Sequence, residues 1–144
     1  MDRIEQAAHR LIFNFGTSSP FDLCEQLGIP VLHMELPEHI NGFTFQKNGK
    51  NTIVLNFKQQ NDRYICAHEL GHIVLHAGLN AVFIRNYTDL CLPRYENEAD
   101  LFASHLLIDE SIAEWSELYR PLTLSLIASL SGLPEAVVRL RFDR

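Results

Sequence analysis

Near the middle of the chain stands the stretch His68-Glu69-Leu70-Gly71-His72, which has the form H-E-x-x-H. Residues four apart on an α-helix share a face, so His68 and His72 would aim two imidazoles at one point. One zinc ion needs this geometry, with a ring nitrogen from each histidine at about 2.0–2.1 Å. Glu69 lies one step round the helix, too far for a third ligand but close enough to take a proton from water. The stretch therefore predicts a catalytic metal site.

The alternative interpretation is a buried helix that carries polar residues without a metal. The residues around the motif are apolar nearly all round, so we expect the helix to be central; they are Ile65, Leu70, Ile73, Val74 and Leu75. A central helix should not carry two histidines and a glutamate without partners, because burying unpaired polar groups is unfavourable. A bound metal removes that penalty, and we therefore favour the metal site.

A third ligand is expected from a second acidic segment, because a catalytic zinc ion usually has three protein ligands. Glu96-Asn97-Glu98-Ala99-Asp100 supplies the candidates. Glu96 and Asp100 fall on one helical face, so Glu96 could ligate the metal while Asp100 accepts a hydrogen bond from the outer nitrogen of a ligand histidine. Glu98 points elsewhere, and we expect it to face solvent and complement the helix dipole. We prefer Glu96 to Glu98, but helix geometry alone leaves both open.

Other polar residues are weaker candidates for the site. His76 lies one turn beyond His72, where the helix is expected to fray, and could replace a carboxylate as ligand. His105 could stabilise an oxyanion. Tyr64, Tyr87 and Tyr95 are possible hydrogen-bond donors to a reacting carbonyl, and the sequence does not choose among them.

The composition bounds the class of protein. The chain has 144 residues, a net charge of −6 and 47% hydrophobic residues, which fits one globular domain and predicts no general affinity for nucleic acid. Three widely spaced cysteines do not form a disulfide framework and fit a reducing compartment. The N-terminus lacks the pattern of a signal peptide, and no apolar run reaches the ~18 residues of a membrane span. We expect a cytoplasmic protein without membrane contact.

Hydrophobic periods and turn signals predict an α+β fold: a single small domain of helices packed on a short antiparallel sheet, with a zincin-like active-site helix. Asn48-Gly49 between two β-rich segments is the strongest hairpin signal in the chain. The expected parts of the domain are N-terminal helices and a hairpin (1–57), metal-site helices (58–110) and C-terminal helices (111–144). The expected elements are helices at 2–15 and 20–27, a strand at 29–33, a hairpin at 42–57, helices at 62–76, 95–108 and 109–119, and short helices at 123–131 and 134–142. Residues 79–95 show no clear period, and residues 92–94 would break a helix. We therefore expect a loop at 79–95 that overhangs the metal site.

The two motifs together resemble the ImmA/IrrE family of metallo-endopeptidases. The resemblance rests on residues 68–76 and 96–107, with support from Asn41-Gly42-Phe43 and Cys66-Ala67, and it spans about residues 20–110. The family often has a proline shortly after the Leu-Leu pair, whereas Ile108-Asp109 follows here, which affects the end of the helix more than the chemistry.

The resemblance implies one Zn²⁺ ion held by His68, His72 and Glu96, with Glu69 as the catalytic residue. It further implies that the protein cleaves a helix-turn-helix repressor, as phage and mobile-element members of the family do to relieve repression. We also expect strand 52–57 to present an edge that pairs with an extended substrate.

Two rival functions remain open. One is a zinc-containing anti-repressor that binds its target without cutting it. The other is a DNA-binding regulator, because residues 124–140 have the spacing of a small helix-turn-helix and arginines follow at 139, 141 and 144. We rank direct nucleic-acid binding lower, because the chain is acidic and the apolar residues of this segment can simply close the core.

Overall fold

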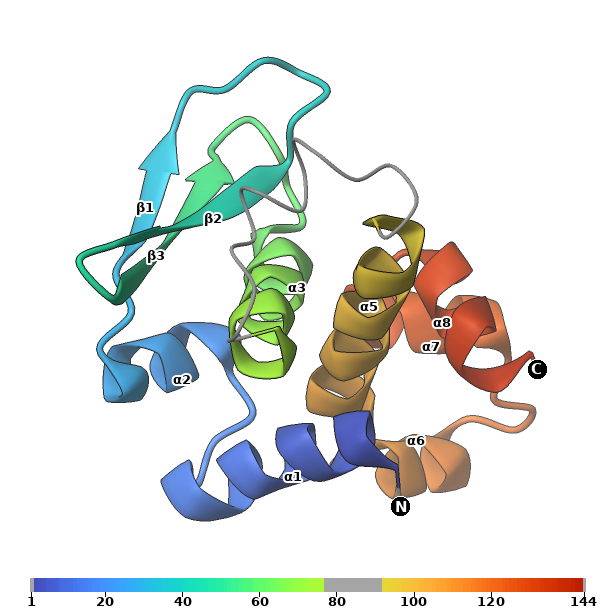
Figure 1. Cartoon of the computed structure of the whole chain (residues 1–144). Helices are drawn as coiled ribbons and strands as arrows, with labels where there is room; N and C mark the ends of the chain where they lie inside the picture. The colour runs from blue at the N-terminus through green and yellow to red at the C-terminus, as the bar shows by residue number, and fades with distance from the viewer. Residues whose placement is uncertain (1, 77–91, 144) are drawn as a thin grey trace.

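A computed structural model describes residues 2–76 and 92–143, in which a small three-stranded sheet lies at one side of a group of helices (Figure 1). The elements in chain order are α1 (Arg3–Phe15), α2 (Pro20–Leu27), β1 (Val31–Met34), β2 (Gly42–Lys47), β3 (Lys50–Asn56), α3 (Asp62–Leu75), α5 (Leu92–Ile108), α6 (Ile112–Leu118), α7 (Leu124–Ser131) and α8 (Glu135–Phe142). The predicted α+β class is confirmed.

The sheet contains the predicted hairpin and one further strand. Asn48 and Gly49 form the turn with φ of 54° and 77°, in the left-handed region that these two residue types tolerate best. β2 pairs antiparallel with β3, and β1 pairs parallel with its other side, so the strand order is β1-β3-β2 and the sheet is mixed. The prediction that strand 52–57 presents a free edge was therefore wrong, because β3 is the central strand.

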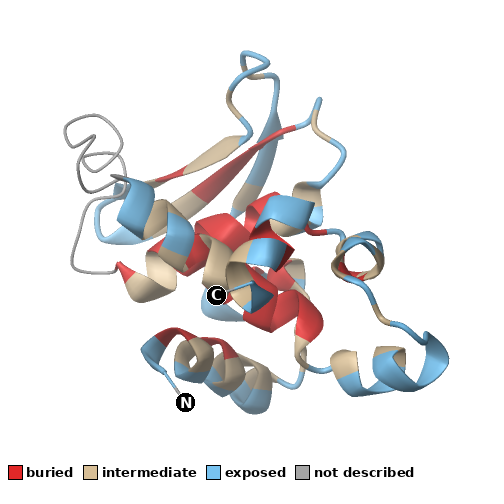
Figure 2. Cartoon of the chain, turned by 90° about the vertical axis from the view of Figure 1, so that its right-hand side faces the viewer, coloured by how far each residue is buried: buried red, intermediate tan, exposed pale blue. Residues whose placement is uncertain are grey.

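The helices form successive layers against this sheet. α3 packs on β2 and β3, α5 lies beside α3, and α7 and α8 lie on the far side of α5, while α1 crosses the lower ends of α3 and α5 (Figure 1). The buried residues concentrate in the central helices (Figure 2). One stripe of α5 faces the core, since Ala99, Phe102, Ala103, Leu106 and Leu107 are all buried. The two central helices, α3 and α5, carry the two polar motifs.

Local capping signals account for the first two helices. Asp2 accepts a hydrogen bond from the backbone of Glu5 at the start of α1, and Gly16 ends that helix in the left-handed conformation. Ser19 caps α2, whose first residue is Pro20. Asn61 stands at the cap position of α3, but its side chain makes no capping hydrogen bond.

Two expected boundaries were wrong. α5 begins at Leu92 rather than at residue 95, because Pro93 occupies the first turn, where a helix tolerates the missing N–H. The rest of the expected loop at 79–91 lies outside the described residues. The helix expected at 109–119 begins only at Ile112, after a turn.

α3 and α5 approach each other closely at Gly71. A Cβ atom at this position would lie 3.0 Å from Cδ1 of Phe102 and 3.2 Å from the backbone Cα and oxygen of Ala99. Glycine therefore permits a separation of the two helices that any side chain would oppose.

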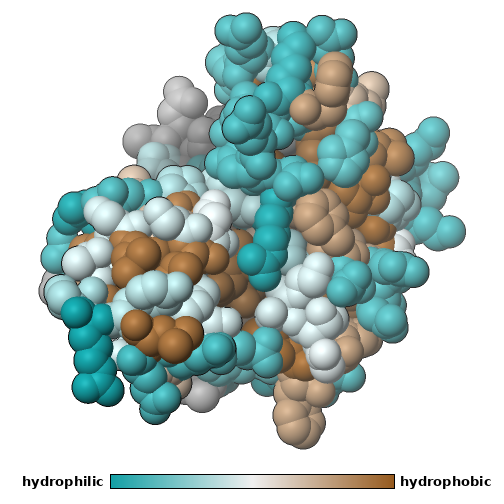
Figure 3. Space-filling model, turned by 180° about the vertical axis from the view of Figure 1, so that it is seen from behind, coloured by the Kyte–Doolittle hydropathy of each residue, from teal (hydrophilic) through white to brown (hydrophobic). Residues whose placement is uncertain are grey.

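The surface seen from behind the molecule is mixed, with hydrophobic residues in several patches separated by hydrophilic ones (Figure 3). Within residues 2–76 and 92–143, no helix combines the length and the apolar character that crossing a membrane requires.

Candidate metal centre

The two sequence motifs meet between α3 and α5. Nε2 of His68 lies 2.9 Å from Oε2 of Glu96, and Nε2 of His72 lies 2.8 Å from Oε1 of the same carboxylate. Both imidazoles therefore converge on one side chain of the neighbouring helix. The structure brings together His68, His72 and Glu96, and it places Glu98 elsewhere.

These three residues fit a divalent metal ion. Their ligand atoms all lie within 4.8 Å of one another. Two imidazole nitrogens and one carboxylate oxygen are a donor set that suits zinc and several other transition metals. The histidines are buried, whereas the side chain of Glu96 is 37% exposed. Three protein ligands with one open side are characteristic of a catalytic rather than a structural site.

Asp100 orients the first histidine from outside. Nδ1 of His68 lies 2.7 Å from Oδ1 of Asp100, and the hydroxyl of Tyr64 donates to the same oxygen, also at 2.7 Å. The hydrogen bond from the outer nitrogen of His68 to Asp100, which helix spacing predicted, is present. Because Nδ1 faces Asp100, Nε2 is the ring nitrogen of His68 that would bind a metal ion.

The charges of the cluster are strongly coupled. Burial acts to lower the pKa of His68, but its hydrogen bonds to Asp100 and Glu96 outweigh burial and raise the pKa to about 10. Burial acts to raise the pKa of Glu96, but His68 and His72 hold that pKa well below its usual range. Burial and Asp100 raise the pKa of the Tyr64 hydroxyl. Without metal, His68 is therefore a cation between two carboxylates.

A second series of contacts supports His72, the other histidine of the motif. Nδ1 of His72 lies 3.2 Å from Nδ1 of His76, whose Nε2 lies 3.0 Å from Oε1 of Glu98, and the other oxygen of Glu98 accepts from Arg3 on α1. If Nε2 of His72 faces a metal, its Nδ1–H donates to His76, and Nε2–H of His76 donates to Glu98. The ring of Tyr95 meets the ring of His76 edge-on, with centroids 4.5 Å apart.

The sequence analysis predicted the wrong environment for two residues in this second series of contacts, Glu98 and His76. Glu98 was expected to face solvent, but its side chain is only 14% exposed and pairs on both oxygens. His76 was expected at a frayed helix end, but it is buried at the C-cap of α3. The four-residue spacing from His72 to His76 was the available signal, because it places both rings on one helical face.

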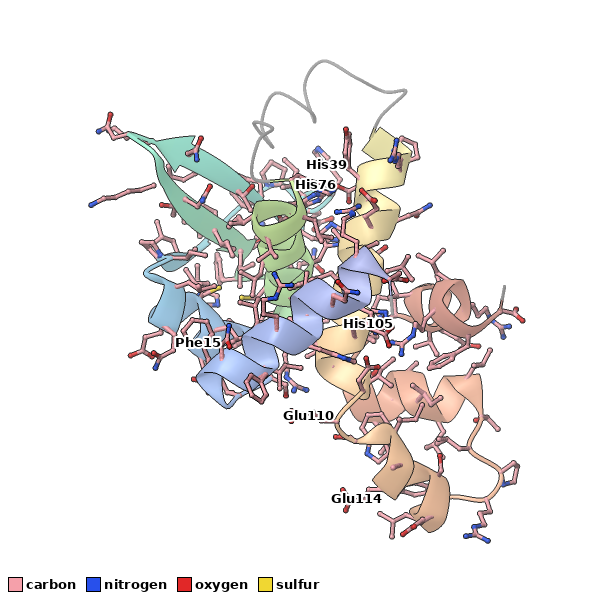
Figure 4. The ribbon with its side chains drawn as sticks, turned by 60° about the horizontal axis from the view of Figure 1, so that its bottom comes forward. Phe15, His39, His76, His105, Glu110 and Glu114 are labelled. Atoms are coloured by element: carbon pink, nitrogen blue, oxygen red, sulfur yellow. The ribbon has the colours of Figure 1, made fainter. Side chains whose placement is uncertain are left out.

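His105 does not belong to this site. It lies towards the other end of α5 from His76, near α1, where its Nδ1 is 2.7 Å from Asp109 (Figure 4). The possible role of His105 in stabilising an oxyanion is therefore wrong. Tyr87, another candidate, lies outside the described residues.

A pocket of about 350 Å³ opens beside the cluster. Its walls come from three parts of the chain: the segment 39–42 before and at the start of β2, the first half of α3, and the first half of α5. Glu69 lines this pocket and is only 2% exposed. Glu69 therefore borders the pocket and is not one of the three residues whose ligand atoms cluster.

Asn56, which the sequence analysis did not single out, fixes one wall of the pocket. Its side chain is buried at the end of β3, and its Nδ2 donates to the backbone oxygens of Leu36, Pro37 and Ile40 at 2.8–3.2 Å. Its Oδ1 accepts from the backbone of Lys58 at 3.1 Å. The signal was a buried polar residue at the end of an apolar strand, which must find partners in the adjoining loop.

The C-terminal helices close the core. Ile127, Leu133, Val137 and Val138 are buried, as the alternative to a DNA-binding role required. Of the arginines that suggested DNA binding, Arg139 pairs with Glu135, and Arg141 with Asp109; Arg144 lies outside the described residues.

A histidine pair on one helix, closed by a carboxylate from the next helix and open to a pocket, is the arrangement of a single-metal peptidase. Residues 24–143 match the IrrE N-terminal-like domain, and the chain belongs to this family of metallopeptidases.

Two relatives extend the comparison. The chain is 33% identical over 141 residues to the uncharacterized immunity region protein 2 of Bacillus phage phi105, covering 96% of this chain and 88% of that protein. It is 26% identical over 111 residues to the metallopeptidase ImmA of Bacillus subtilis (strain 168), covering 76% of this chain and 65% of that protein.

Proposed function

We propose that the protein is a zinc-dependent endopeptidase in which His68, His72 and Glu96 hold the ion and Glu69 moves the proton. The convergence of both histidine Nε2 atoms on the Glu96 carboxylate, with buried Glu69 beside them at the pocket, carries this proposal. Membership of a metallopeptidase family supports it.

The ion, when bound, supplies Lewis-acid chemistry, because it polarises a substrate carbonyl and lowers the pKa of water. Glu69 accepts the proton of the attacking water and passes it to the leaving amine, which is the work of a general base and then a general acid. Asp100 and His76 hold the two imidazoles in place through their outer nitrogens. Tyr64 lies at the pocket and completes the contacts of Asp100.

The pocket suits an extended segment of polypeptide. Its wall at residues 39–42 is backbone that leads into β2, and the hydrogen bonds of Asn56 fix that wall. We infer that the substrate lies between this wall and the two helices, with the scissile carbonyl near Glu96. β2, rather than β3, is the strand that borders this groove.

We infer that the target is a helix-turn-helix repressor, whose cleavage relieves repression. The resemblance to the ImmA/IrrE family suggests this target, and the name of the phage relative places that protein in an immunity region. The second candidate is an anti-repressor that inactivates the same target by binding alone; the shared family supports both.

The test compares Glu69→Gln with wild type against a purified helix-turn-helix repressor. Glu114→Gln on exposed α6 is the matched control, because it removes the same charge far from the pocket. We expect wild type and Glu114→Gln to cleave the repressor, and Glu69→Gln to keep its zinc while losing about 10²–10⁴-fold in rate. Equal cleavage by all three would refute the role of Glu69. Derepression by Glu69→Gln without cleavage would favour the binding candidate.

A further inference from the structure

A second cluster of histidines and carboxylates joins α1 to the end of α5. Glu5 and His9 lie four residues apart on α1, and His105 and Asp109 lie four residues apart at the end of α5. Two such pairs on neighbouring helices aim four side chains at one region. The first centre has a similar arrangement, in which His68 and His72 on α3 face the first half of α5.

Asp109 is the centre of this second cluster. Its Oδ2 lies 2.6 Å from Nε2 of His9 and 2.7 Å from Nδ1 of His105. The two imidazole rings are nearly perpendicular, at 88°, with centroids 5.9 Å apart. With Glu5 included, one potential ligand atom from each of the four residues lies within 4.8 Å of the others, the same limit that the first centre meets.

Arg141 holds the Asp109 carboxylate in position. Its NH2 donates to Oδ1 of Asp109 at 2.6 Å, and its NH1 donates to the hydroxyl of Ser104 at 3.1 Å. Only Oδ2 then faces the two histidines. Ligating carboxylates in metal sites are commonly hydrogen-bonded in this way through their second oxygen. The side chains of His105 and Asp109 are only 7% and 13% exposed, whereas that of His9 is 34% exposed and leaves a route for an ion from solvent.

We propose that Glu5, His9, His105 and Asp109 bind a second zinc ion, which clips α1 to the end of α5. Two imidazoles and two carboxylates supply four protein ligands, the number found in structural zinc sites, so this ion has no open position for a substrate. Arg141 offsets part of the negative charge, so the second site binds zinc more weakly than the first. The proposal is independent of the peptidase function, because the four residues line no part of the pocket beside Glu69.

The test counts metal ions in the full-length protein. Purified protein is dialysed against micromolar zinc and analysed for zinc per chain, with cobalt(II) absorption as a second readout of tetrahedral coordination. We expect two zinc ions in wild type, one in His9→Gln/His105→Gln, and two in the control His33→Gln, whose histidine is half exposed and outside both clusters. Graded chelation should remove the second ion first.

Zinc binding at the first centre is the internal control for these variants. The zinc ion that stays on His68, His72 and Glu96 shows that His9→Gln/His105→Gln is folded, and Glu5→Gln offers a milder change with a weaker second site. One zinc ion in wild type that the double histidine variant keeps, or two zinc ions in the double histidine variant, would overturn the proposal. Loss of peptidase activity alone would not bear on it, since the readout is the number of ions.

Discussion

Replacing Gly71 with alanine tests whether the spacing of α3 and α5 sets the metal site. Helix propensity alone predicts a gain, because alanine is favoured over glycine inside a helix by about 1 kcal/mol. The new Cβ, however, would lie 3.0 Å from the Phe102 ring and 3.2 Å from the backbone of Ala99, tighter than ordinary van der Waals contact. The two helices must then move apart by a few tenths of an ångström.

The magnitudes decide the direction. Overpacking a well-packed contact usually destabilises by about 1–3 kcal/mol, which offsets or exceeds the helix gain, so the free energy of unfolding should stay the same or fall by up to about 2 kcal/mol. The effect on zinc should be larger than the effect on stability, because His68 and His72 stand on α3 while Glu96 stands on α5. We expect zinc affinity to fall by about 10–100-fold, the range seen when support of a metal ligand is lost.

Chelator competition measures the zinc affinity of Gly71→Ala, and denaturation in chelator measures the stability of its metal-free form. The double variant Gly71→Ala/Ala99→Gly is a sharp control. It should not recover zinc affinity, because the obstructing atoms of Ala99 belong to the backbone. A Gly71→Ala protein about 1 kcal/mol more stable than wild type, with unchanged zinc affinity, would refute the reasoning.

Three further predictions concern the residues around the ligands. Asp100→Asn removes the charge that orients His68, so chelator competition should show about 10-fold or more weaker zinc binding, and unchanged affinity would contradict its role. Glu98→Gln weakens the contacts of this carboxylate with exposed Arg3 and buried His76 and should lower the free energy of unfolding by about 1–3 kcal/mol in urea, against less than about 1 kcal/mol for the exposed control Glu135→Gln. Because the pKa of His68 is raised to about 10, zinc must displace its proton at pH 7. Apparent zinc affinity should therefore rise by about tenfold per pH unit and level off near pH 10, and calorimetry in buffers of different ionisation enthalpy should detect the released proton.

Short-range signals predicted most of the fold. Capping residues and glycines marked α1 and α2, and Asn48-Gly49 marked the hairpin, because each acts through neighbouring backbone. The parallel pairing of β1 with β3 could not be predicted, since no turn joins the two strands and neither sequence specifies its partner. One consequence was that a central strand was mistaken for an edge.

The same limit applies to the site. Four-residue spacing singled out His68 and His72 and favoured Glu96 with Asp100 over Glu98, because residues four apart share a helical face. It failed for Glu98, whose partner Arg3 is 95 residues away in sequence. A helical wheel shows the direction of a side chain but not which distant helix covers that direction, and here α1 does.

The position of α1 also matters to anyone trimming this protein. The family match starts at residue 24, yet Arg3 on α1 contacts Glu98 in the first half of α5, and His9 contacts Asp109 just after the end of α5. A fragment cut at the homology boundary would strip Glu98 of its guanidinium and uncover the underside of the ligand-bearing helix. A fragment designed from the family match alone would lack α1, and with it the contacts that hold Glu98 and Asp109 in place.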